Sequence, residues 1–323
     1  MRLYVRRVAL ALFLLYLAVF PGSTITVALD QVPAWGDWMG GALLLLQGAI
    51  VFCWLLGSFG RRGALAAALV FLPAWGVEHL GVTSSFPFGR YSYTGQLQPQ
   101  LFGTVPLAIP CAWLMVAVGA WQIANLLRPG SGLQVAGYRS QATGRSTLSL
   151  SSCHHVIASI SRLGTQHTAG SALLAATLVL LLDLQIEPVA TAINQYWVWL
   201  DGGAYYGVPA ANFAAWWAIG LVLAVIVMGA LRWHDQRPTT NDQRPTNTLL
   251  GARQLMSYAL RITFCAIPAN LYLLNTLMFT AINLSRGYVV AGSIGAGVLV
   301  VFAVATITVA KNKRHSHHIA GLG

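Results

Sequence analysis

Three carboxylic acids are candidates for chemistry because they lie within or at the end of long apolar segments. Asp183 follows the run LLAATLVLLL, Glu187 comes four residues later, and Glu78 ends another apolar segment next to His79. Burying an ionisable group in a membrane costs about 2.5–3.5 kcal/mol even on insertion scales, so such a group is a functional candidate by default. The four-residue spacing places Asp183 and Glu187 on one helix face.

These acids are expected to carry a proton near neutral pH. The C-terminal end of a helix disfavours negative charge, and burial and a neighbouring carboxylate act in the same direction. A protonated carboxylic acid can serve as a general acid, and an ionised neighbour can serve as the base. The sequence therefore predicts proton-transfer catalysis by Asp183, Glu78 and Glu187, without deciding which is acid and which is base.

The composition shows what kind of chain must position these acids. Of the 323 residues, 56% are hydrophobic and 8% are charged, and the mean hydropathy is +0.64. A soluble domain carries about 25% charged residues, so soluble, disordered and disulfide-scaffold proteins are excluded. We predict an all-α polytopic integral membrane protein, a single transmembrane domain over 1–323 with about eight spans. The spans cover 8–27, 39–59, 64–80, 105–127, 169–187, 208–231, 256–282 and 288–310, the third being short and interrupted by Pro73.

The basic residues orient these spans. With the N-terminus inside, all of the 19 Lys and Arg residues except Arg90 and Arg286 fall on the inner side, as the positive-inside rule requires. The net charge of +11 is thus explained by topology and does not call for nucleic acid. We expect a multi-pass cell-membrane protein with both termini cytoplasmic, the acids towards the outer leaflet, and the basic tail KNKRHSHH against anionic lipids. The alternative for the first span is a signal peptide cleaved near Thr26-Val27-Ala28.

The inner loop over 128–168 is rich in Ser, Gly, Thr and Gln and contains Cys153-His154-His155. No second pair of ligands with metal-site spacing accompanies these residues, so a polar linker is favoured over a metal site. No nucleotide-binding motif is found either. We therefore predict no metal and no cofactor.

Two segments of the chain resemble each other, 64–127 and 169–231. The first contains FGTVP ending at Pro106 and the second contains YGVP ending at Pro209, and a tryptophan, Trp113 or Trp216, follows each proline by seven residues. Each proline is expected at the first position of a helix. An aromatic outer loop and a helix that carries an acid precede each motif. We predict a parallel internal repeat with a site at the interface between its halves, followed by two further helices over 256–310.

Aromatic and polar residues close to the acids are the predicted substrate-binding residues. Aromatic faces can stabilise a cation, although rings at this depth also form interfacial belts. The amides could position water or pack helices. The predicted substrate-binding residues are Phe88, Tyr91, Tyr93, Trp113, Asp201, Tyr205, Tyr206, Asn212 and Trp216.

At these positions the sequence resembles the membrane-bound carotenoid hydratases, the family of bisanhydrobacterioruberin hydratase and gamma-carotene hydratase. The resemblance covers about residues 75–220 and departs from the family's Asp-Pro at Glu187-Pro188. The matching stretches are EHLGV from Glu78, PFGRY from Pro87 with Tyr93, GTVP with Trp113, Leu182-Asp183, Glu187-Pro188-Val189, and YYGVP from Tyr205 with Asn212-Phe213 and Trp216.

This resemblance implies addition of water to the terminal C1=C2 double bond of an acyclic carotenoid end group, giving a tertiary alcohol without any cofactor. Asp183 or Glu78 would protonate the alkene, and Glu187 or the ionised member of the pair would deprotonate the attacking water. The implied partners are a membrane-dissolved carotenoid, water and other enzymes of the carotenoid pathway.

Other classes remain open. A carotenoid end-group cyclase also begins by protonating an alkene and differs in what captures the cation. A proton-coupled transporter would also contain repeats and buried acids, but its acids should follow a path across the bilayer. The clustering of the acids on one side favours an enzyme. A pigment-binding scaffold would have no need of them.

Overall fold

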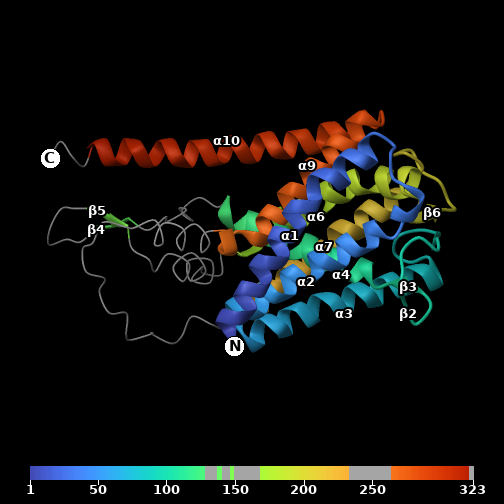
Figure 1. Ribbon diagram of the computed structural model, residues 1–323, viewed down its shortest axis with the longest axis horizontal. Coiled ribbons are helices and arrows are strands. Elements are labelled where there is room, and N and C mark those ends of the chain that lie inside the picture. The colour runs from blue at the N-terminus through green and yellow to red at the C-terminus, as the bar shows by residue number, and fades with distance from the viewer. Residues whose placement is uncertain (128–136, 140–145, 149–167, 233–262, 320–323) are drawn as a thin grey trace.

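The computed structural model describes residues 1–127, 137–139, 146–148, 168–232 and 263–319, and most of this part of the chain is a bundle of long helices (Figure 1). Seven of the described helices are long and apolar enough to cross a membrane. The predicted all-α polytopic membrane protein is confirmed. The main helices are α1 (Arg2–Ala28), α2 (Met39–Phe59), α3 (Arg61–Ser84), α4 (Ala108–Leu126), α6 (Thr168–Pro188), α7 (Ala210–Arg232), α9 (Ile267–Ser285) and α10 (Val289–Ile319).

Eight spans were predicted. In the described part of the chain, seven helices are apolar enough to cross a membrane, and α9 is an eighth long helix that is not among them. Helix α9 packs against α10, α4 and α1, so it is part of the bundle. Its buried side carries four polar side chains that lower its hydropathy. These side chains are Asn275, Thr276, Thr280 and Asn283.

Two expectations about prolines are wrong. Helix α3 runs without a break from Arg61 to Ser84 through Pro73, because a membrane bundle can satisfy the backbone groups that a proline leaves free. Neither repeat proline begins a helix. Pro106 lies in strand β3, two residues before α4, and Pro209 directly precedes α7, because the loops in front of both helices close as short antiparallel pairs.

Helix α4 is the centre of the bundle. It packs against α2, α3, α6, α7 and α9, and most of its residues are buried. A helix that is hydrophobic all round is typical of such a position. Trp113, in the second turn of α4, is thereby held where side chains from both predicted repeats can reach it.

The loops at one end of the bundle form short strands (right side of Figure 1). Strand β1 (Tyr91–Tyr93) pairs antiparallel with β6 (Trp197–Trp199), and β2 (Gln100–Leu101) pairs with β3 (Val105–Pro106). A 3₁₀ turn, η1 (Ala34–Gly36), precedes α2, and α6 continues into a π-helical turn, η3 (Val189–Ile193). Strands β4 (Gly137–Arg139) and β5 (Ser146–Leu148) belong to the predicted inner loop, whose Cys153-His154-His155 lies outside the described residues.

The two motif loops share an unusual backbone feature. Phe102 and Gly103 have φ values of 51° and 67°, and Tyr206 and Gly207 have φ values of 50° and 83°. A non-glycine residue in this left-handed region is uncommon, so its occurrence before both prolines is a local similarity of the two halves. The parallel repeat itself stays a prediction.

Candidate active site

Strands β1 and β6 form an aromatic ladder, by which we mean Tyr91, Tyr93, Trp197 and Trp199. Tyr91 is paired with Trp199 and Tyr93 with Trp197, and the pair between them, Ser92 and Val198, is exposed. Because side chains alternate along a strand, all four aromatic rings lie on the inward face of the ladder. The tyrosines come from the first predicted repeat and the tryptophans from the second.

The tyrosines of the ladder hold Glu78, which lies in α3. Both hydroxyls donate hydrogen bonds to Glu78 Oε2, at 2.7 Å each, and Trp113 Nε1 donates to Oε1 at 2.9 Å. Gly81, one turn after Glu78, makes this possible, since a Cβ there would lie 2.9 Å from the Tyr91 hydroxyl and 2.6 Å from the Phe88 ring. The result is a buried carboxyl group with three donors.

The hydroxyls of these tyrosines stay protonated. Burial, together with the nearby Glu78 carboxylate, raises the pKa of Tyr91 and of Tyr93 above the usual tyrosine value. Each hydroxyl can therefore donate to Glu78 throughout the physiological pH range.

The tryptophans of the ladder hold Glu187, which lies in the last turn of α6. Trp199 Nε1 and Trp197 Nε1 donate to Glu187 Oε2 at 2.9 and 3.3 Å, and Asn212 Nδ2 in α7 donates to Oε1 at 3.0 Å. Every one of these groups is an N–H donor that cannot accept a hydrogen bond. Glu187 is thus surrounded by groups suited to an ionised carboxylate.

Asp183 lies one turn before Glu187 and shares its amide partner. Asn212 Nδ2 also donates to Asp183 Oδ2, at 3.1 Å, so the two hydrogens of one amide group connect the two acids. The Asp183 side chain is fully buried, and its Oδ1 has no hydrogen-bond partner in the described part of the chain. The predicted proximity of the two acids on one helix face is observed.

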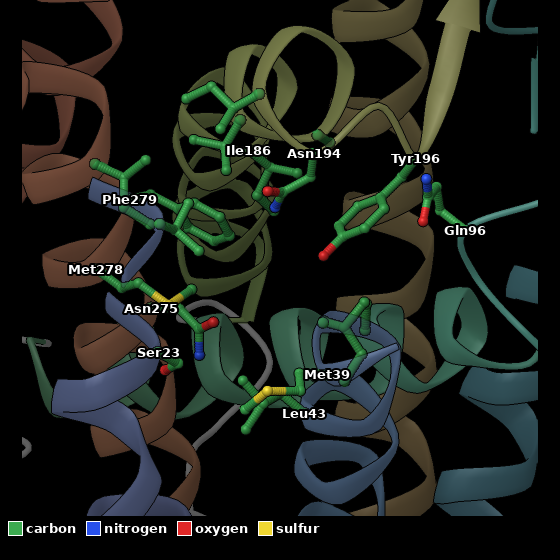
Figure 2. A pocket seen from close by; sticks show the side chains of 18 of the residues that line it. Ser23, Met39, Leu43, Gln96, Ile186, Asn194, Tyr196, Asn275, Met278 and Phe279 are labelled. Atoms are coloured by element: carbon green, nitrogen blue, oxygen red, sulfur yellow. The ribbon is translucent and has the colours of Figure 1, made fainter. Parts of the chain in front are cut away.

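A cavity of about 780 Å³ opens beside these acids, a size typical of a small-molecule site. It reaches from the loops at 32–37 and 194–197, at the ladder end of the bundle, into the space between α1, α2, α4, α6 and α9. Figure 2 shows Tyr196 and Gln96 on one side of this space and Met278, Phe279 and Asn275 on the other. The predicted site residues that line it are Glu78, Phe88, Tyr91, Tyr93, Glu187, Asn212 and Trp216.

Two other predicted site residues stand directly behind the wall of the cavity. Asp183 does not line the cavity, but it accepts a hydrogen bond from Asn212, which does. The Trp113 ring stacks on the Trp216 ring, with centroids 3.9 Å apart and an interplanar angle of 18°. The Trp113–Trp216 pair joins α4 to α7 and supports both Glu78 and the cavity wall.

The remaining predicted substrate-binding residues, Asp201, Tyr205 and Tyr206, do not line the cavity. The Asp201 carboxylate accepts from the Arg90 backbone N–H at 2.7 Å and forms an ion pair with the Arg90 guanidinium. These contacts lower the pKa of the exposed Asp201 carboxyl. Tyr205 donates to the carbonyl of Leu184, and Tyr206 packs on Tyr205, so Asp201, Tyr205 and Tyr206 support the loops around the site.

Trp197 and Trp199 are not among the predicted substrate-binding residues, although both hold Glu187. Their alternate spacing matches that of Tyr91 and Tyr93 and is typical of one face of a strand, which was the available signal. Gln47 and Tyr16, which line the cavity, gave no signal, because lone polar residues in apolar helices usually serve packing. In the described part of the chain, no group of three or more His, Cys, Asp or Glu side chains is placed to hold a metal ion.

Comparison with known proteins agrees with a carotenoid-related role. Residues 39–302 match a family described as "Carotenoid biosynthesis protein". A curated relative, bisanhydrobacterioruberin hydratase of Haloarcula japonica, is 28% identical over 166 residues, which cover 51% of this chain and 45% of that protein. The chain thus spans less than half the length of this relative. No solved structure matches the chain.

Proposed function

Because the chain belongs to the carotenoid biosynthesis protein family, we propose that it is a hydratase that adds water to the terminal double bond of an acyclic carotenoid end group. The observation that carries this proposal is a membrane cavity bordered by two buried carboxyl groups, Glu78 and Glu187, which the aromatic ladder connects. The name of the relative from Haloarcula japonica supports hydration as the reaction class.

We assign the proton-donating role to Glu78. Its partners Tyr91 and Tyr93 carry hydroxyl groups, which can accept a hydrogen bond as well as donate one. A proton on Glu78 Oε2 can therefore stay hydrogen-bonded until the alkene arrives. Transfer of this proton to C2 of the C1=C2 double bond converts the π bond into a C–H bond and leaves a tertiary carbocation on C1.

The aromatic faces around the cavity would stabilise this cation. The rings of Tyr91, Trp199 and Trp216 line the cavity, and a cation within about 6 Å of a ring face is attracted by its quadrupole. The surrounding apolar wall limits the access of water to the molecule that reacts. A hydratase needs one water to enter, whereas a cyclase must exclude it.

We assign the base role to Glu187. A water molecule attacks the cation to form a C–O bond, and its proton passes to the Glu187 carboxylate, which gives the tertiary alcohol. Asn212 holds the Glu187 carboxylate in place through one hydrogen of its amide group and binds Asp183 through the other. The proton that Glu187 receives then returns to Glu78 through solvent, which restores both acids. The steps balance with one water and one alkene.

The positions of two arginines support a proposal for the side of the membrane on which the site lies. The two arginines expected outside, Arg90 and Arg286, lie at the ladder end of the bundle, paired with Asp201 and Asp30. We propose that this end faces outwards, that the cavity opens towards the outer leaflet and that both termini are cytoplasmic.

Pigment analysis in a host that makes an acyclic carotenoid tests this proposal. Cells with and without the chain are grown in ordinary and in ¹⁸O-labelled water, and the carotenoids are analysed by mass spectrometry. A pigment that gains one water with the heavy isotope supports the hydratase, whereas an isomer of unchanged mass would establish a cyclase. Untouched pigment despite good expression would reject both and favour a transporter.

A further inference from the structure

A second polar cluster lies in the cavity, away from the ladder. It consists of Tyr16 in α1, Gln47 in α2 and Asn275 in α9, all buried and all lining the cavity. Along α2, the lining extends from Met39 at the outer end to Gln47, eight residues or about 12 Å deeper. This amide cluster therefore forms the deep end of the cavity.

The hydrogen bonds within the amide cluster leave specific groups unused. Asn275 Nδ2 lies 2.7 Å from Gln47 Oε1 and 2.8 Å from the Leu271 carbonyl, and these two acceptors take both of its hydrogens. The Tyr16 hydroxyl lies farther from the same nitrogen, at 3.5 Å, and the Met115 sulfur lies at 3.9 Å. The Tyr16 hydroxyl is therefore only a weak acceptor for Asn275. The hydrogen of the Tyr16 hydroxyl has no acceptor in the described part of the chain.

Two more groups of the amide cluster lack partners. Asn275 Oδ1 is buried without any hydrogen bond, and Gln47 Nε2 donates to no described residue. Buried polar groups in folded proteins are nearly always paired, and those that are not usually await a water or a ligand. The amide cluster thus offers one acceptor and two donors at the deep end of the cavity.

We propose that Tyr16, Gln47 and Asn275 form a hydroxyl-binding subsite, which holds an O–H group through a bond to Asn275 Oδ1 and a bond from Tyr16 or Gln47. The O–H group comes either from the alcohol end of a bound isoprenoid or from a water molecule. The isoprenoid alcohol as the source of this O–H group rests on the proposed function, because the hydrated product would carry such an alcohol. A hydrocarbon end group leaves the three polar groups unpaired.

Ordinary helix packing is the competing explanation, and the chain contains a matched example of it. Asn283 lies on the same helix, is fully buried, donates to the Gln185 carbonyl and also has an unpaired Oδ1. Asn283 does not line the cavity. The variant Asn283→Leu therefore removes a buried α9 amide without touching the proposed subsite, which makes it the control.

The test compares linalool, an acyclic tertiary terpene alcohol, with myrcene, a hydrocarbon of the same carbon skeleton. Binding to the full chain in detergent is followed by quenching of tryptophan fluorescence, with correction for partition into empty micelles. The unaltered protein should prefer linalool by about 5-fold to 10-fold, the value of one hydrogen bond. Asn275→Leu and Gln47→Leu should abolish the preference, Tyr16→Phe should weaken it, and Asn283→Leu should retain it.

Each source of the O–H group has its own result. Loss of the linalool preference in Asn275→Leu identifies the ligand alcohol. A water molecule is identified by a different result. In that case neither the unaltered protein nor any variant prefers linalool over myrcene, and ¹⁸O incorporation is about 10-fold slower in Asn275→Leu but not in Asn283→Leu. If neither differs from the Asn283→Leu control, the subsite is rejected. Because linalool binding needs no turnover, failure of the proposed hydratase activity would be seen separately.

Tyr16→Phe keeps the test valid if both leucine variants fail to fold. It removes a single oxygen atom and retains the ring that packs against Phe20. A folded Tyr16→Phe protein whose linalool preference and ¹⁸O rate both equal those of the unaltered protein would also count against the subsite.

Discussion

The two halves of the site hold their carboxyl groups with different donors. Glu78 is bound by two tyrosine hydroxyls and one indole N–H, whereas Glu187 is bound by two indole N–H groups and one amide. Hydroxyl groups exchange donor and acceptor roles, but N–H groups do not. This difference is the basis for the proposal that the first half holds a proton and the second receives one.

The halves also differ in which acid reaches the cavity. Glu78 lies 28 residues before Pro106, and Asp183 lies 26 residues before Pro209, so these two acids correspond in the predicted repeat. Glu78 lines the cavity, whereas Asp183 is behind the wall and Glu187, one turn later, takes its place. The position four residues after Glu78 is Val82, so the first half has no second acid.

Removal of the cavity acids should give the largest effect. Glu78→Gln and Glu187→Gln should each reduce hydration by about 100-fold to 10,000-fold, the range of general acid–base catalysis. Asp183→Asn, which acts through Asn212, should reduce it by about 10-fold to 100-fold, the value of a hydrogen bond to a charged group. Initial rates of product formation in membranes with equal amounts of protein check this order. If Asp183→Asn were the most damaging of the three, Asp183 would be the proton donor.

Substitution of the hydrogen-bond donors in the aromatic ladder should give the second largest effect and should distinguish the two halves of the site. Tyr93→Phe and Trp199→Phe each remove one hydrogen bond to a carboxyl group and should slow hydration by about 10-fold to 100-fold. Only Tyr93→Phe should also shift the alkaline limb of the pH–rate profile, because that limb reports loss of the proton from Glu78, the proposed acid that Tyr93 holds. Val198→Thr, on the exposed side of the ladder, is the control and should change neither. A shift of the same limb in Trp199→Phe would reverse the assignment of acid and base.

Substitutions of the stacked tryptophans, Trp113 and Trp216, should have a smaller effect on the rate of hydration, and they separate the loss of a hydrogen bond from the loss of packing. Trp113→Phe should slow hydration by about 10-fold, because it removes a donor to Glu78 together with part of the stack. Trp216→Phe weakens the same stack, worth about 0.5–1.5 kcal/mol, but no hydrogen bond to an acid. Thermal unfolding of both variants in detergent, measured beside their rates, distinguishes the two roles. Equal loss of rate at equal stability would show that Trp113 acts through packing alone.

The smallest effect is expected at the exposed Arg90–Asp201 pair, which closes the end of the ladder. Since its pKa is lowered in the folded protein, Asp201 contributes stability above its unfolded value of about 3.9, and this contribution is lost as the pH falls through the folded value. The melting temperature of Asp201→Asn should therefore lie slightly below that of the unaltered protein at pH 7. The two should converge below about pH 4. A difference that persists in acid would mean that the side chain acts without its charge.

The membrane class, the approximate positions of the helices and the three acids could all be predicted from the sequence. Apolar runs need only their length to be recognised, and Met39–Phe59 was predicted with its observed bounds. The prolines misled the prediction, because Pro73 lies inside a continuous helix and Pro106 lies in a strand. A proline in the sequence does not show whether neighbouring helices supply hydrogen bonds to the backbone groups that it leaves free.

Composition and spacing by themselves determined that this chain is an all-α membrane protein with acids on one helix face, since hydropathy and the helical period are local properties. Only the tertiary structure decided which of these acids meets the cavity, because that depends on how β1 pairs with β6 more than 100 residues away. The pairing register turns four aromatic side chains inwards, and a shift of one residue would turn them all outwards. The amide cluster at Tyr16, Gln47 and Asn275 likewise exists only because three distant helices meet, and single polar residues in a sequence carry no record of that contact.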